Sequence, residues 1–148
     1  MRRADRDVEI AQRAYGPESS REESDAIADR VSVIGERLLL MREIPVQSPF
    51  SVMLMFDRLE MLARGWDRFS YVADLSEATR PGPETRAALK DRVLRLSPRV
   101  GHAAFVVGGN AIMRAMARLF AYGMGLRNVT IHVTRPEAIE EVGRAMGR

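Results

Sequence analysis

The sequence has no cysteine, a single lysine and few aromatic residues. Without cysteine there can be no disulfide scaffold, thiolate-bound zinc, iron–sulfur cluster or thiol catalysis. Only one Trp, three Tyr and five Phe occur among 148 residues. No apolar run approaches the ~18 residues that a membrane-spanning helix needs, and the first residues lack the apolar stretch of a secretory signal. We therefore expect a cytoplasmic protein without a transmembrane segment.

Arginine supplies almost all of the positive charge. The chain has 23 basic and 20 acidic residues, a net charge of +3, and Lys90 is its only lysine. Basic and acidic residues are mixed along the chain, whereas a nucleic-acid-binding surface needs a basic stripe with aromatic side chains for stacking. We expect no nucleic-acid partner. The hydrophobic fraction of 46% and the charged fraction of 29% are typical of a globular domain.

The first thirty residues differ from the rest. Residues 1–30 hold six arginines and eight acidic residues but few apolar ones, and Gly16-Pro17 interrupts any continuous element. The spacing of Val8, Ala11 and Tyr15 indicates a short helix within this segment. We expect a loosely held polar arm over residues 1–30 and one folded domain over residues 31–148.

From residue 31 the hydrophobic pattern becomes regular. Two short strands over 31–34 and 37–41 are separated by a tight turn, and further strands are expected over 69–75, 102–107 and 129–133. Four helices follow the second to fifth strands, and they begin at Ser48-Pro49, Pro81-Gly82-Pro83, Asn110 and Thr134. In the helix after Asn110, the expected buried stripe is Ile112, Met116, Leu119 and Phe120.

The resulting order is ββαβαβαβα. Strands that alternate with helices form right-handed crossovers, and these give a mostly parallel sheet. The opening pair is antiparallel because only a short turn joins its strands. The sequence therefore predicts an α/β fold with a mixed, mostly parallel sheet, an antiparallel edge hairpin and flanking helices.

Three segments carry a resemblance to a known family. They are the strand 71–76 ending in Asp-Leu-Ser, the strand 105–107 that turns through Gly108-Gly109, and the closing strand and helix start over 129–138. With the element order, they resemble STAS or SpoIIAA-like (anti-sigma-factor-antagonist-like) domains, which are related to small CRAL-TRIO cores. The likeness covers residues 31–146. It implies a non-enzymatic regulatory module of bacterial signalling that docks a protein partner through the strand-end crevice and the loop 76–83.

One departure from this family concerns phosphorylation. Phosphorylatable STAS domains carry Asp-Ser-Ser-Gly at the start of the helix that follows the Asp-Leu-Ser strand. Residues 80–85 stand there in this chain, and they contain no serine. Thr85 is the nearest hydroxyl, so Thr85 and Ser76 are the candidate phosphorylation positions, and a phosphoswitch in the usual form is not expected.

Polar residues follow the expected strands where parallel strands end. Ligands and partners of open α/β sheets meet this carboxyl edge. The expected constellation at this edge comes from the loops after three strands, and Glu77, Thr134 and Arg135 belong to it. The residues expected to bind a partner or ligand are Asp74, Ser76, Thr79, Arg80, Gly108, Gly109, Asn110 and Arg114.

Two of these positions have a structural alternative. At Gly108-Gly109-Asn110 the glycines allow close approach of a ligand, and the helix N-terminus could receive the acidic head group of a small ligand or lipid. Alternatively, the glycines only permit the turn and Asn110 caps the helix. Asp74 could contact a partner, or it could cap the loop that follows it.

Nothing in the sequence indicates a catalytic centre. His102 and His132 are the only histidines, and their places at the start and end of two strands predict that they lie near opposite rims of the sheet. Walker A, Gly-x-Ser-x-Gly and His-Glu-x-x-His motifs are absent. We expect no catalytic residue, metal or cofactor, and an enzyme of unknown chemistry is the third hypothesis.

Two observations separate docking from ligand binding. A ligand site should contain a mostly apolar cavity of ~300 Å3 or more that opens beside Asn110. A docking module should instead have a shallow surface there and a large exposed apolar patch. Met53, Leu54 and Met61 form a second apolar flank on their helix, which suits a partner, a homodimer contact or cover by the N-terminal arm.

Overall fold

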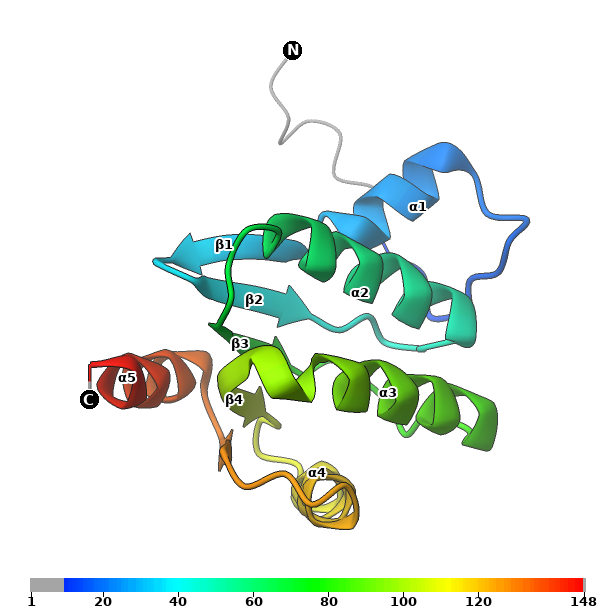
Figure 1. Ribbon diagram of the computed structural model, residues 1–148. Coiled ribbons are helices and arrows are strands. Elements are labelled where there is room, and N and C mark those ends of the chain that lie inside the picture. Colours follow the sequence, from blue (N-terminus) through cyan, green and yellow to red (C-terminus); the bar gives the residue numbers. More distant parts are fainter. Residues whose placement is uncertain (1–9, 148) are drawn as a thin grey trace.

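The computed structural model describes residues 10–147, and its centre is a five-stranded sheet with the strand order β1-β2-β3-β4-β5 (Figure 1). Strand β1 (Val31–Gly35) pairs antiparallel with β2 (Leu38–Arg42). Strands β3 (Phe69–Asp74), β4 (Val100–Val106) and β5 (Val129–His132) extend the sheet in parallel. The expected α/β fold with an antiparallel edge hairpin is therefore confirmed.

Five helices surround this sheet. Helices α2 (Pro49–Leu62), α3 (Pro83–Leu96) and α4 (Ala111–Gly123) connect the parallel strands and cover one face, while α5 (Arg135–Met146) covers part of the other. The remaining helix, α1 (Arg21–Ala28), packs against α2, and a short 3-10 turn over Ser97–Arg99 follows α3. Among residues 10–147, no helix has the length and apolar character needed to cross a membrane.

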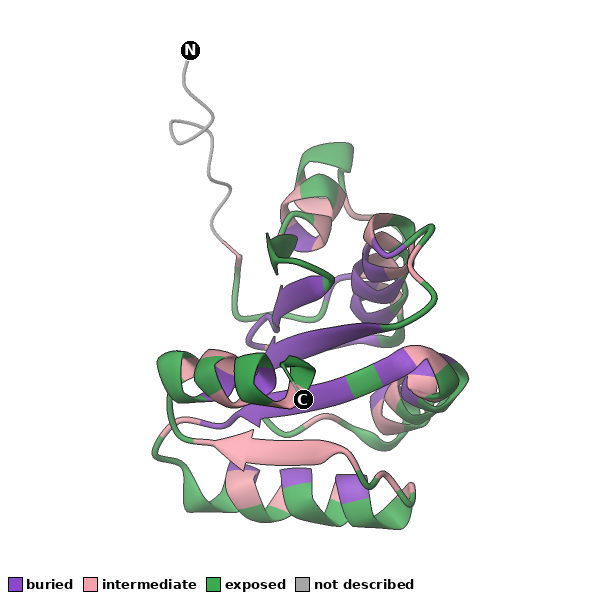
Figure 2. Ribbon diagram, turned by 60° about the vertical axis from the view of Figure 1, so that its left-hand side comes forward, coloured by how far each residue is buried: buried purple, intermediate pink, exposed green. Residues whose placement is uncertain are grey.

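Alternate residues of the central strands supply two separate cores. Leu39, Tyr71 and Phe105 face α2, α3 and α4, whereas Leu40 and Val72 face α5. The strands are buried on both sides because side chains of a strand alternate between its faces. Figure 2 shows this burial in the middle of the sheet, and it shows that β5, at the edge, is only half buried.

The helix caps form where the sequence predicts them. Ser48 Oγ accepts a hydrogen bond from Ser51 N at the start of α2, and Pro49 occupies the first turn. Asn110 Oδ1 accepts from the backbone N–H groups of Ile112 and Met113 at the start of α4. These side chains satisfy N–H groups that have no partner within their own helix.

The N-terminal segment is more ordered than expected from its polarity. No helix forms over the described residues 10–15, and Val8 lies outside the described part. The short helix is α1 instead, which begins at the capping box of Ser20 and Glu23. Tyr15 is 3% and Ile27 0% exposed, so both belong to the main core. The segment is held because these two large side chains pack under it.

The buried face of α4 agrees with the expectation only in part, because Met116 and Phe120 pack against the core but Ile112 and Leu119 do not. Met113, Ala117 and Ala121 face the core, whereas Ile112 and Leu119 point outward, with 70% and 71% of their surface exposed. The expected stripe followed the largest apolar residues. Alanine at two of the three buried positions adds little to a hydrophobic pattern but lets the helix pack close to its neighbours, so half of the expected stripe lies outside the buried face.

Candidate functional site

Asp74 lies at the carboxyl edge of the sheet, at the end of β3, and it is only 6% exposed. Its Oδ1 accepts hydrogen bonds from the backbone N–H and hydroxyl of Ser76, at 2.9 and 2.6 Å. Its Oδ2 accepts from Nε and Nη2 of Arg135. Burial alone would raise the pKa of Asp74, but the hydrogen bonds from Ser76 and the Arg135 charge lower it below its ordinary value. Asp74 therefore fixes the loop and the start of α5.

The turn after β4 lies directly beside the Ser76 loop. Gly108 has a φ of +64°, and a Cβ at this position would come 3.6 Å from the Cβ of Ser76. Leu75 N also donates to Val106 O at 2.7 Å. The structure therefore brings Asp74, Ser76 and Gly108 together. The side-chain oxygen of Asn110 caps α4 by accepting a hydrogen bond from Ile112 N, as expected if this turn has only a structural role.

The other expected site residues are spread along the same edge. Thr79 is exposed, and its N–H and hydroxyl both donate to Pro45 O, at 2.8 Å each. Arg80 is exposed and Arg114 is half-buried on α4. Thr85 is 5% exposed, and its hydroxyl donates to Gln47 O at 3.5 Å. Ser76 is the exposed one of the two candidate phosphorylation positions, and phosphorylation of either remains a prediction.

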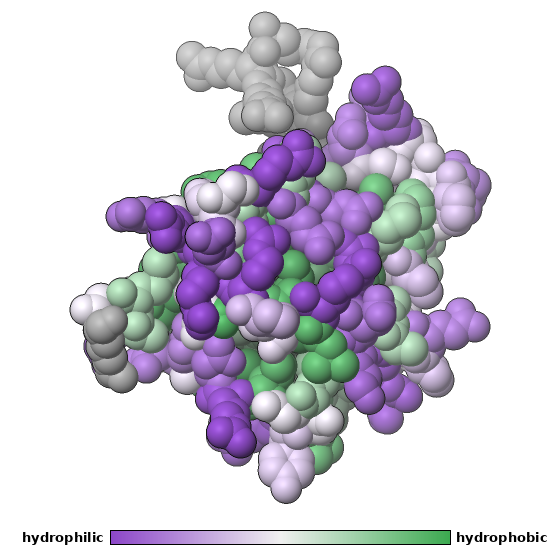
Figure 3. Space-filling model, in the orientation of Figure 1, coloured by the Kyte–Doolittle hydropathy of each residue, from purple (hydrophilic) through white to green (hydrophobic). Residues whose placement is uncertain are grey.

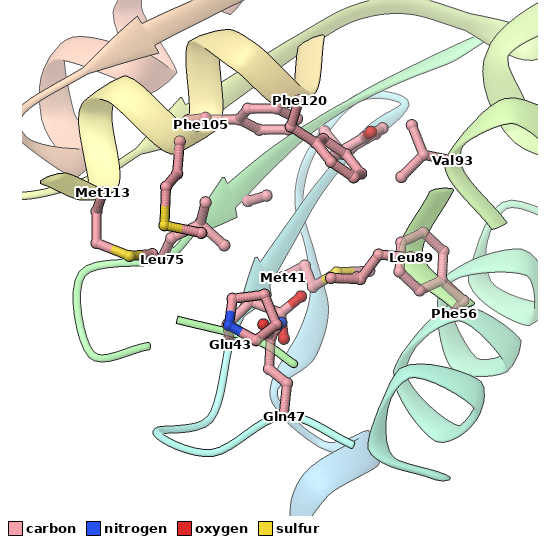
Figure 4. A pocket seen from close by; sticks show the side chains of 15 residues that line it. Met41, Glu43, Gln47, Phe56, Leu75, Leu89, Val93, Phe105, Met113 and Phe120 are labelled. Atoms are coloured by element: carbon pink, nitrogen blue, oxygen red, sulfur yellow. The ribbon is translucent and has the colours of Figure 1, made fainter. Parts of the chain in front are cut away.

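A cavity of about 90 Å3 lies beneath this edge, between the sheet and helices α2, α3 and α4 (Figure 4). Its wall is almost entirely apolar: Met41, Phe56, Tyr71, Ala73, Leu75, Pro81, Leu89, Val93, Phe105, Met113, Met116, Ala117 and Phe120, together with Glu43 and Gln47. In Figure 3 hydrophobic side chains reach the surface in the lower middle of the view, between the positions of α3 and α4 in Figure 1.

Glu43 and Gln47 are the polar members of the wall, and they lie side by side in Figure 4. Glu43 is 4% exposed, and its burial raises the pKa to about 7, against smaller opposing effects of Gln47 and Arg30. The Gln47 amide is close enough to the Glu43 carboxyl to lower its pKa, but among residues 10–147 no acceptor lies within hydrogen-bond geometry of Gln47 Nε2. Burial, with the repulsion of Glu43, also raises the pKa of Tyr71.

Glu43 and Gln47 are not among the site residues that the sequence predicts. The sequence predicts an edge hairpin over 31–41 and polar site residues only after the later strands. Strand β2 is nevertheless parallel to β3, so its end reaches the same carboxyl edge. The available clue was an acidic residue directly after the apolar run Leu38–Met41, followed by a glutamine in the next loop.

An exposed apolar stripe runs along the outer face of α4. Ile112, Leu119 and Tyr122 have exposed fractions of 70%, 71% and 86%, and Ala115 is exposed between them. Their spacing of three, four and three residues places them in one line on the helix. We call these four residues the α4 stripe. No other element of residues 10–147 carries three large apolar side chains with such exposure.

The two histidines lie close together rather than at opposite rims. His102 Nε2 is 2.9 Å and His132 Nε2 is 2.7 Å from Thr130 Oγ1. The register pairs Ala104 with Thr130, so both rings flank this threonine on one face of the sheet. The expectation failed because β5 has only four residues and β4 begins before His102, at Val100.

Comparison with known proteins assigns no family to this chain. Neither a family model nor a curated protein sequence matches it. The resemblance to STAS domains therefore remains a prediction, and the functional argument rests on the residues described above.

Proposed function

We propose that this protein is a non-enzymatic interaction module that binds an acidic amphipathic helix of a partner protein along the α4 stripe. The supporting observation is the exposure of Ile112, Leu119 and Tyr122. Large apolar side chains in one exposed line are typical of a surface that a partner covers.

The spacing of the stripe favours a helical partner. Positions 112, 115, 119 and 122 repeat at intervals of three and four residues. This is the pattern with which one helix packs against another in coiled coils. The small Ala115 and the three larger side chains then offer a knobs-into-holes surface of about three turns.

The charge of α4 favours an acidic partner. The two charged residues of this helix, Arg114 and Arg118, are both positive. Arg118 is exposed beside Leu119 on α4. Because α4 has no acidic side chain, pairing of two α4 helices in a homodimer would bring arginine against arginine. Like charges at such positions disfavour self-pairing, whereas acidic flanks on another protein would be attracted.

This proposal moves the docking surface from the carboxyl edge and the loop 76–83, where the sequence places it, to the outer face of α4. Gly108, Gly109 and Asn110 lead into α4, and the loop 76–83 lies at the same edge of the sheet. The resemblance to STAS domains would place such docking in bacterial regulation. The alternative is a small ligand or lipid whose acidic head group is held at Gly108-Gly109-Asn110. It is less well supported, because Asn110 Oδ1 caps α4 and the cavity of about 90 Å3 is smaller than the ~300 Å3 expected of such a site.

Site-specific photo-cross-linking tests this proposal. A benzophenone amino acid is placed at Leu119, and in a control at Leu94, which is an exposed leucine of α3. In extract of the native cells, we expect a discrete protein adduct from position 119 only, with a cross-linked peptide that is acidic and helix-forming. Its yield should fall as salt is raised, since the flanking charges are screened.

Three results would contradict the proposal. They are adducts of equal yield from both positions, adducts to lipid only, and adducts only to further copies of this chain. A reduced yield at low salt would also contradict the role of the arginines.

A further inference from the structure

We propose that the cavity under the carboxyl edge is a binding site for a small apolar molecule that carries one hydroxyl group, a short-chain alcohol or a phenol. This site is separate from the α4 stripe, and it does not depend on the proposed docking function. Three features of the described residues support this site: the apolar wall, the Gln47 amide nitrogen without a hydrogen-bond acceptor, and the adjacent Glu43 carboxyl.

The Gln47 side chain is the observation that points to a ligand. Gln47 is 8% exposed and lines the cavity, and its buried Nε2 has no hydrogen-bond partner within the part of the chain that the structure describes. A buried donor without an acceptor is unfavourable by about 1–3 kcal/mol, and native proteins rarely leave one. An acceptor atom inside the cavity would remove this penalty.

Glu43 defines the rest of the polar group. Its carboxyl lines the same end of the cavity and lies beside the Gln47 amide (Figure 4). A carboxylate accepts hydrogen bonds, while the Gln47 amide nitrogen donates. A hydroxyl can satisfy both at once, because its oxygen accepts from Gln47 and its hydrogen is donated to Glu43. A protonated amine could pair with Glu43, but it has no lone pair for Gln47.

The wall and the volume define the body of the ligand. Apart from Glu43, Gln47 and the Tyr71 hydroxyl, the wall consists of aliphatic, aromatic and methionine side chains. The volume of about 90 Å3 is below the ~150 Å3 of an engineered cavity that holds benzene. Met41, Met113 and Met116 are unbranched and adaptable, so small movements can admit a ring of that size. A lipid chain does not fit this space.

Methionine-methyl NMR can test the site with phenol as the probe and toluene as its near-isosteric control. Met41, Met113 and Met116 line the cavity, whereas Met53 and Met61 are exposed on α2 and serve as internal controls. We expect phenol to shift the signals of the three cavity methionines in a saturable way and to leave the two exposed ones unchanged. We expect toluene to bind about fivefold more weakly, because it lacks the hydroxyl.

Two matched variants link the binding to Gln47. Gln47→Leu should bring the affinities of phenol and toluene within about twofold of each other, since the donor is lost. Gln12→Leu, the same change at an exposed position, should keep the original ratio. If Gln47→Leu does not fold, Ala117→Val provides the test, because it adds a side chain to the wall and should abolish phenol binding.

The proposal is overturned if phenol shifts all methionines alike or gives no saturable shift. It is also overturned if toluene binds as tightly as phenol, if Gln47→Leu keeps the preference for phenol, or if Ala117→Val binds phenol as well as the parent does.

Discussion

Arg135 binds Asp74 through both Nε and Nη2, at 3.0 and 2.8 Å from Oδ2, although 61 positions separate the two residues in the chain. This contact joins the first residue of α5 to the last residue of β3. It fixes the start of α5, the helix on the second face of the sheet, to the carboxyl edge. The contact lies beside the loop that contains Ser76.

We therefore expect Asp74→Ala to lower the free energy of unfolding by about 2–3 kcal/mol, because it leaves the Ser76 N–H and hydroxyl and the Arg135 guanidinium without their acceptor. Urea denaturation measures this change. Glu77→Ala is the control, since the Glu77 side chain is 63% exposed and only pairs with Arg30 at the surface. Its effect should stay below about 0.5 kcal/mol. Equal stabilities of Asp74→Ala and the parent would contradict this role.

The Asp74 contact also predicts a loss of stability in acid. The pKa of Asp74 is lower in the folded protein than its ordinary value of 3.8. Its contribution is therefore complete above pH 3.8 and disappears as the pH falls through the folded-state pKa. Denaturation of the parent and of Arg135→Leu between pH 2 and 6 should show a smaller acid loss in the variant, and identical pH profiles would contradict the pairing.

Glu43 should make the folded protein less stable as the pH rises, which is the opposite of the effect of Asp74. Its pKa is about 7 in the folded protein and 4.5 in the unfolded chain, so the folded state binds one more proton between these values. Stability should fall by about 3 kcal/mol from pH 4.5 to 7 and then stay level. Glu43→Gln should remove this fall, whereas Glu36→Gln, in the exposed hairpin turn, should keep it. A Glu43→Gln profile that still falls over this range would show that another group is responsible.

The two glycines after β4 should differ in their tolerance of a side chain. Gly108 has a positive φ, whereas Gly109 does not and has open space where a Cβ would lie. Gly108→Ala should reduce the free energy of unfolding by about 1 kcal/mol, because alanine disfavours that conformation. Gly109→Ala should leave it unchanged or slightly raised. Thermal denaturation of both variants checks the difference, and equal losses would show that the turn has another conformation.

The α4 face gives a further stability test. Met113 is 8% exposed and contacts the core, whereas Leu119 is 71% exposed. Met113→Ala should reduce the free energy of unfolding by about 2 kcal/mol. This is at the lower end of the losses found for core methionines, because Met113 already borders a cavity. Leu119→Ser should change it by less than about 0.5 kcal/mol. If Leu119→Ser is the more damaging variant, α4 faces the sheet with its other side.

Most of the fold could be predicted from local sequence features. The strand at 69–74 is a run of aromatic and β-branched residues, and Ser48-Pro49 marks a helix start that the structure contains. The orientation of α4 could not be predicted in this way. The large residues Ile112 and Leu119 dominate its hydrophobic pattern, yet the buried positions are Met113 and the small Ala117 and Ala121.

The candidate site was predictable only in part. The rule that parallel strands end at one edge located Asp74 and Gly108 correctly relative to each other, because Asp74 ends β3 and Gly108 comes two residues after the end of the neighbouring β4. Glu43 and Gln47 depend on the direction of β2 relative to β3, which the hairpin pattern did not reveal. Both residues line a cavity whose other walls come from α2, α3 and α4, and no local pattern encodes that packing.

The affinity of the partner for two leucine variants tests the docking proposal most directly. The acidic segment recovered by cross-linking is synthesised as a peptide and titrated calorimetrically against the parent, Leu119→Ser and Leu94→Ser. We predict that Leu119→Ser weakens binding at least about tenfold, as loss of a central apolar contact should, while Leu94→Ser stays within about twofold of the parent. Equal affinity of the peptide for the Leu119→Ser variant and the parent would contradict the assignment of α4 as the docking surface.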